Sequence, residues 1–65
     1  MKVLVNGDWR DVSSDLLATA LQELGYRESV FATAVNGTVV PSSARTEATL
    51  REGDRIEVLA PMQGG

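Results

Sequence analysis

The sequence contains no cysteine and no histidine. These absences remove the thiolate nucleophile, the imidazole base and the corresponding metal ligands from the chemistry that this chain offers. They also exclude a disulfide framework, which agrees with a reducing compartment. The nine Asp and Glu residues are scattered and lack the spacing of a calcium-binding loop. The composition therefore predicts neither an ordinary enzyme nor a metal site.

Basic residues are few as well. Six Lys and Arg stand against nine Asp and Glu, which gives a net charge of −3, and the basic residues form no run. A nucleic-acid-binding surface needs clustered basic side chains to neutralise phosphates, so the charge argues against that class. Long apolar runs, as in a signal peptide or a membrane span, are also absent. We therefore expect a cytoplasmic protein that binds neither nucleic acid nor membrane.

The chain is short, with 65 residues. A domain of this size buries only about 60% of the surface that its unfolded chain exposes, so its core is thin. It has little room for an enclosed small-molecule pocket, which usually needs several hundred cubic ångströms. We expect one domain over residues 1–60 and a flexible tail over residues 61–65.

Two Asn-Gly pairs predict two β-hairpins. Asn6-Gly7 supplies the positive φ angles of a tight type I′ turn, and Asn36-Gly37 repeats the same chemistry. Alternating apolar residues flank the first pair. The only tryptophan, Trp9, follows that turn, and we expect it in the core because large apolar groups are scarce in this sequence.

Between the hairpins the apolar period becomes helical. Apolar residues recur at i, i+3, i+4 and i+7 and so share one helical face: Leu17, Ala20, Leu21 and Leu24. We expect a side chain of residues 13–15 (Ser, Ser, Asp) to accept the free N–H groups at the start of this helix. Gly25 suits the left-handed position that follows its last turn.

The second half of the chain predicts a connection and a last strand. Pro41 lacks an N–H group, so it should close the second hairpin or lie at an edge of the sheet. Residues 42–50 show little periodicity and predict an irregular connection with one helical turn, anchored by Leu50. A turn at residues 52–54 then precedes a strand in which Ile56 and Val58 are the buried positions.

This order of elements predicts an α+β protein with a β-grasp (ubiquitin-like) fold. The elements follow one another as β-β-α-β-β-β. In such a fold, a mixed sheet of about five strands packs on one main α-helix, because a single amphipathic helix laid across the sheet covers its apolar face.

The same motifs resemble the ThiS family of small sulfur carriers. The resemblance covers nearly the whole chain and rests on the first hairpin, the leucine-rich helix, AVNGTVVP at residues 34–41, TLREGDRIEVL at residues 49–59 and the Gly-Gly end. It implies that this chain is a carrier for thiamin thiazole biosynthesis and not an enzyme. No catalytic residue, metal or bound cofactor is implied for the chain itself.

The resemblance also implies the chemistry and the partners. An E1-like adenylating enzyme of the ThiF type would use ATP and Mg to join AMP to the carboxylate of Gly65. Sulfur from a persulfide donor would displace AMP and leave a thiocarboxylate, which passes its sulfur to a thiazole synthase of the ThiG type. An α-carboxyl group has a pKa of about 3.5, so Gly65 is ionised at neutral pH and can attack the α-phosphorus of ATP.

The tail residues fit this implied role. Gly64 and Gly65 lack Cβ atoms and can thread a narrow cleft with φ values that other residues avoid. Together with Gln63 and Met62 they form the segment expected to enter the partner's active site. Leu59 is the expected contact on the partner-binding surface.

Three other functions remain open at this stage. The small, sulfur-carrying subunit of molybdopterin synthase shares the fold, the terminus and the thiocarboxylate chemistry. A ubiquitin-like modifier would join Gly65 to a lysine of another protein instead. A plain interaction module would use the β-grasp domain alone, with Gly64 and Gly65 as a loose end.

Overall fold

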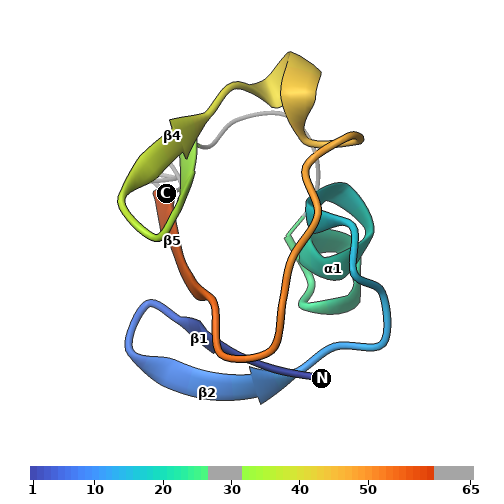
Figure 1. Ribbon diagram of the computed structural model, residues 1–65, viewed down its shortest axis with the longest axis vertical. Helices are drawn as coiled ribbons and strands as arrows, with labels where there is room; N and C mark the ends of the chain where they lie inside the picture. Colours follow the sequence, from blue (N-terminus) through green and yellow to red (C-terminus); the bar gives the residue numbers. More distant parts are fainter. Residues whose placement is uncertain (27–31, 60–65) are drawn as a thin grey trace.

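The computed structural model describes residues 1–26 and 32–59 of the chain (Figure 1). The elements of these residues follow the predicted order, and their bounds are β1 (Lys2–Val5), β2 (Asp8–Asp11), α1 (Leu17–Glu23), β3 (Ala32–Val35), β4 (Thr38–Val40), the 3-10 turn η1 (Ser42–Ala44) and β5 (Arg55–Leu59). In Figure 1, α1 lies on the right and the strands lie along the left and lower sides. The predicted α+β class is confirmed.

The five strands form one mixed sheet in the order β2-β1-β5-β3-β4. The last strand, β5, lies in the centre between the two hairpins. It pairs in parallel with β1 and antiparallel with β3. Ile56 has a paired residue on each side: Val5 of β1 and Val35 of β3. The two hairpins are therefore joined into one sheet through β5.

Both Asn-Gly pairs form the predicted turns. Asn6 and Gly7 have φ values of 50° and 89°, and Asn36 and Gly37 have values of 52° and 85°. A type I′ turn requires positive φ at both central residues, so the two hairpins have the expected connection.

The core lies between one face of the sheet and α1. The sheet contributes alternate residues of β1 and β5, and α1 contributes its apolar face. Among the described residues, the buried apolar ones are Val3, Val5, Val12, Leu17, Ala20, Leu21, Leu50, Ile56 and Val58. The predicted helix face is thereby confirmed, with Leu24 half-buried at the edge of this cluster. The connection also behaves as expected, because β4 ends before Pro41, one 3-10 turn follows and Leu50 is buried.

The prediction that Trp9 lies in the core was wrong. Its side chain is 60% exposed. Trp9 pairs with Leu4 across the first hairpin, and residues directly opposite one another share a face of the sheet. Because Val3 and Val5 point into the core, Leu4 between them points to the other face, and Trp9 points there with it.

The prediction of a side-chain cap at the helix start holds only in part. The hydroxyl of Ser14 accepts the N–H of Leu16, the N-cap residue, at 3.0 Å, but no side chain of residues 13–15 accepts the N–H groups of Leu17 and Ala18. Instead, the N–H of Leu17 donates to the carbonyl of Ala48 at 2.9 Å, and the N–H of Ala18 donates to that of Arg45 at 3.1 Å. Backbone carbonyls of the connection between β4 and β5 therefore satisfy the first donors of the helix.

The C-terminal end of α1 has the predicted glycine. Gly25 has a φ of 94°. Its N–H donates to the carbonyl of Gln22 at 3.0 Å, and the N–H of Tyr26 donates to that of Leu21 at 2.9 Å. These two hydrogen bonds define a Schellman motif, which requires the left-handed residue that glycine supplies.

Glu23, the last residue of α1, ties the helix to the segment that precedes it. Its carboxylate accepts the backbone N–H and the hydroxyl of Ser13, both at 2.8 Å, and the N–H of Ser14 at 3.1 Å. The backbone hydrogen bond from Ser13 is the main cause that holds the pKa of Glu23 below its ordinary value of 4.5.

This lowered pKa predicts an acid-sensitive contribution to stability. A carboxyl group whose pKa is lower in the folded than in the unfolded chain stabilises the fold above the unfolded pKa, and the contribution is lost as pH falls through the folded value. Glu23→Gln should therefore be less stable than the wild type at neutral pH, and the difference should shrink below about pH 4.5. Urea unfolding at a series of pH values measures it. If the difference in the free energy of unfolding between the two proteins stayed constant with pH, the ionised form of Glu23 would not be the source of the stabilisation.

Candidate functional site

The sheet has one face that α1 does not cover, here called the open face. Alternation along β5 places Arg55, Glu57 and Leu59 on it, because Ile56 and Val58 are buried. The strand pairings then assign the neighbours of these residues to the same face: Leu4, Trp9, Ala32, Ala34 and Val39. Among the described residues, the exposed large apolar side chains are those of Trp9, Val39 and Leu59, which are 60%, 71% and 72% exposed. All three lie on the open face.

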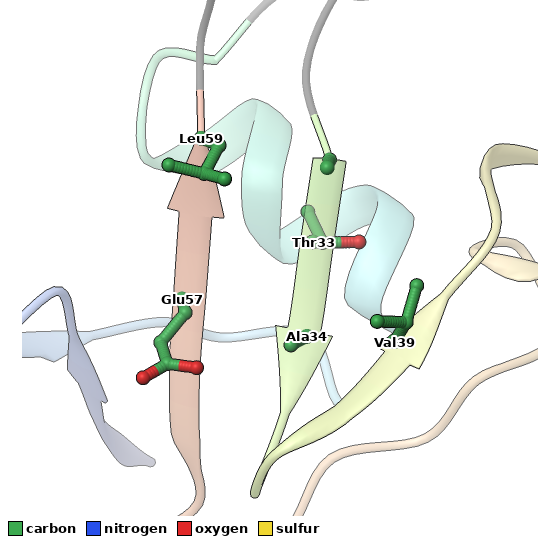
Figure 2. A pocket seen from close by; sticks show the side chains of 6 residues that line it. Thr33, Ala34, Val39, Glu57 and Leu59 are labelled. Carbon is green, nitrogen blue, oxygen red and sulfur yellow. The ribbon is translucent and has the colours of Figure 1, made fainter.

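A shallow hollow lies on the open face beside the end of β5 (Figure 2). Two rows of paired residues form it: Val39, Ala34 and Glu57 in one, and Ala32 and Leu59 in the other. The small alanines of β3 lie between the larger side chains of β4 and β5, and this difference in size makes the surface concave. We call this feature the Leu59 hollow.

The Leu59 hollow is too small for an ordinary cofactor or substrate. Its volume is about 130 Å³, whereas ligand pockets usually measure roughly 300–1,000 Å³. The small alanines and the exposed Leu59 make its lining mostly apolar, with the carboxylate of Glu57 at one side. A surface of this kind suits one apolar side chain of a protein partner.

Trp9 lies away from the Leu59 hollow on the same face. It pairs with Leu4, and Leu4 pairs with Arg55, so Trp9 is level with the start of β5. Leu59 is at the other end of that strand, roughly 13 Å further along at the usual rise per residue. Trp9 therefore provides an exposed apolar control site outside the hollow.

Two asparagine side chains hold the ends of β5. Asn6 accepts the N–H of Val58 at 2.9 Å and donates to its carbonyl at 3.1 Å. Asn36 accepts the N–H of Arg55 at 2.9 Å and donates to the carboxylate of Asp54 at 3.0 Å. The turn residue of each hairpin thus pins one end of the central strand.

The predicted site residues fall into two groups. Leu59 is the last residue of β5 and is strongly exposed, as a partner contact should be. Met62, Gln63, Gly64 and Gly65 lie outside the described residues. Sequence reasoning did not assign Ala34 and Val39 to the site. The two-residue turn at Asn36-Gly37 predicts that these two residues pair, and the alternation along the strands places them on one face.

Within residues 1–26 and 32–59, the acidic side chains form no group of three or more that could hold a metal ion. No helix in this part of the chain combines the length and apolar character that a membrane span requires. Lys2 and Asp11 form an ion pair at 3.0 Å, and both side chains are exposed. Exposed ion pairs contribute little to stability.

The sheet order, the parallel pairing of the first and last strands and the single helix define a β-grasp protein. The crystal structure of the thiamine biosynthesis protein ThiS from Geobacter metallireducens is similar to it, with a TM-score of 0.81 and 29% sequence identity over 100% of both chains. The model of the ThiS family matches residues 3–65. The chain belongs to the ThiS family.

One curated relative is a much longer protein than this chain. A thiazole synthase of Paramagnetospirillum magneticum is 33% identical over 66 residues, which cover 100% of this chain and 20% of that protein. This chain thus spans about a fifth of that relative's length. A segment similar to the whole chain therefore occurs within a larger thiazole synthase.

Proposed function

We propose that this protein carries sulfur, as a thiocarboxylate on Gly65, to a thiazole synthase. The observation that carries the proposal is the match to the ThiS family over residues 3–65, a range that includes Gly64 and Gly65. The likeness of the fold to the ThiS structure, with a TM-score of 0.81, also supports it.

The proposed chemistry takes place on the carboxylate of Gly65. In the active site of an E1-like adenylating enzyme of the ThiF type, this carboxylate attacks the α-phosphorus of Mg-ATP and pyrophosphate leaves. The terminal sulfur of a persulfide then attacks the acyl carbon, and AMP leaves. A thiol cleaves the sulfur–sulfur bond that results, which gives a disulfide and the thiocarboxylate. ATP and Mg are bound by the partner in this scheme.

The chain itself presents the tail and a surface for docking. Gly64 and Gly65 enter the partner's active site with Gln63 and Met62, because glycine permits close approach of the backbone to the nucleotide. The six residues 60–65 span at most about 20 Å when extended. A partner surface that contacts Leu59 must therefore lie within about 20 Å of its adenylation site.

A thiazole synthase of the ThiG type is the proposed receiver of the sulfur. The support is that a thiazole synthase contains a segment similar to this entire chain. Joining a carrier and its receiver in one polypeptide raises their effective concentration without any new contact. A carrier and a partner that are not joined need a docking surface instead, and we propose that the Leu59 hollow serves for this, first of all toward the adenylating enzyme.

Reconstitution tests this function. The mixture contains this chain, a ThiF-type enzyme, Mg-ATP, a donor with isotopically labelled persulfide sulfur, a thiol, a thiazole synthase and its other substrates. Label should enter the thiazole, and only when the chain is present. Label that instead enters molybdopterin, when the large subunit of molybdopterin synthase replaces thiazole synthase, would assign the chain to the rival pathway. Attachment of the chain to lysines would make it a modifier.

Leu59→Asp should weaken binding to the adenylating enzyme by about tenfold or more, because it places a charge where an apolar contact becomes desolvated. Thermal unfolding should change little, since Leu59 is 72% exposed. Isothermal titration with the ThiF-type enzyme measures the affinity. The matched control is Trp9→Asp, which places the same charge on the same face outside the hollow. Equal losses for both variants would show that the Leu59 hollow is not the contact.

A further inference from the structure

The side chain of Asn6 forms hydrogen bonds with the end of β5, beyond the point where β1 ends and its backbone enters the first turn. The pairing of β1 with β5 includes Leu4 with Arg55 and Val5 with Ile56. On the opposite side, β3 pairs with β5 as far as Leu59. The end of β5 therefore extends beyond β1 and has a strand neighbour on one side.

The amide group of Asn6 takes the place of the missing peptide. The backbone N–H of Asn6 donates to the carbonyl of Ile56 at 2.9 Å, and in the described part of the chain this is the last backbone hydrogen bond on that side of β5. Its side-chain carbonyl and NH₂ then satisfy both the N–H and the carbonyl of Val58. A side-chain amide has the same donor and acceptor as a peptide unit, so it extends the ladder to Val58.

The turn alone does not account for asparagine at this position. Asn6 has a φ of 50°, and Gly or Asp also serves at the first central position of a type I′ turn. Glycine has no side chain to bond Val58, and an ionised aspartate accepts but cannot donate. The second hydrogen bond, to the carbonyl of Val58, thus requires the amide.

We propose that Asn6 is a positioning residue for sulfur loading. By holding Val58 against the sheet, it fixes the orientation of Leu59 and the point from which the tail starts. The inference rests on the proposed function, because it concerns how the carrier presents its tail to the adenylating enzyme. Without the amide, the end of β5 is paired on the β3 side alone, beside the packing of Val58 in the core, and the partner must order this segment more when it binds.

The test compares two glycine variants, each of which removes two side-chain hydrogen bonds of a turn asparagine. Asn6→Gly keeps a turn-compatible residue and removes both hydrogen bonds to Val58. Asn36→Gly does the same at the second hairpin, where the lost bonds hold Asp54 and Arg55 at the start of β5. The bonds of Asn6 are partly buried and those of Asn36 are exposed, so urea unfolding of both variants accompanies the kinetics, and rates are compared under conditions where both remain folded.

Initial rates of pyrophosphate release with a ThiF-type enzyme and Mg-ATP give KM and kcat for each carrier variant. Asn6→Gly should raise KM roughly three- to tenfold with little change in kcat, because ordering the strand end on binding weakens association. Asn36→Gly should leave KM close to the wild-type value. Equal KM values for the two variants, raised or not, would overturn the proposal.

Amide hydrogen exchange supplies a readout that does not depend on the partner. The N–H of Val58 should exchange faster in Asn6→Gly than in Asn36→Gly under conditions where both remain folded. Equal exchange would show that the amide does not hold the strand end, and would overturn the proposal even if KM rises. A wild-type chain that is not adenylated would refute the proposed function, and with it the positioning role in loading, whereas faster exchange of Val58 would still establish the clamp.

Discussion

A chain that lacks Gly65 should lose sulfur loading while its domain stays folded. In the shortened chain the reactive carboxylate belongs to Gly64 and lies up to about 3.5 Å short of its proper place. A displacement of about 1 Å at a reacting group can reduce the rate by roughly 100-fold. We therefore expect at least that loss in the rate of adenylation. Pyrophosphate release with a ThiF-type enzyme and Mg-ATP measures it.

The controls for this truncation concern the fold and docking. The described core residues lie between Val3 and Val58, so thermal unfolding should be unchanged. Binding to the adenylating enzyme should also persist in part, because the Leu59 hollow is intact. Loading at the wild-type rate would show that the Gly65 carboxylate is not the acyl group. A plain interaction module would keep its activity after this deletion.

Leu17→Ala should remove a large share of the stability of the domain. Leu17 is fully buried at the start of α1, and replacing a buried leucine by alanine costs about 2–5 kcal/mol. A domain of this length has a total stability of roughly 3–10 kcal/mol. The substitution therefore removes a large share of the total, and part of the population should be unfolded at 37 °C. Urea unfolding measures the loss: the midpoint concentration of urea should fall, while the slope of the free energy of unfolding against urea stays the same.

The matched control is Leu59→Ala, which makes the same chemical change on the open face. Because Leu59 is 72% exposed, this variant should stay within about 0.5 kcal/mol of the wild type. Equal losses of stability in the two variants would contradict the placement of the core between α1 and the sheet.

Local patterns in the sequence predicted most of the fold. The two Asn-Gly turns and the apolar face of the helix depend on residues close together in the chain, and both are present. The error at Trp9 was avoidable. A two-residue turn at Asn6-Gly7 sets the register that places Trp9 opposite Leu4, and hence away from the buried Val3 and Val5. The preference of tryptophan for burial was the weaker argument.

The features that sequence reasoning missed depend on distant contacts. The donors at the start of α1 bind carbonyls of Arg45 and Ala48, which local capping rules do not consider. The second role of Asn6 arises only when β5 docks beside β1. The Leu59 hollow likewise needs β3, β4 and β5 side by side. Only the exposure of Leu59 followed from alternation within one strand.

The most direct test of the sulfur-carrier account is the intact mass of the chain after incubation with a ThiF-type enzyme, Mg-ATP, a persulfide donor and a thiol. The account predicts a gain that corresponds to one oxygen replaced by sulfur, located by fragmentation on the peptide that ends at Gly65. The gain should require both ATP and the persulfide. An unchanged mass with an activator known to be competent, or the same gain on a chain that lacks Gly65, would contradict the account.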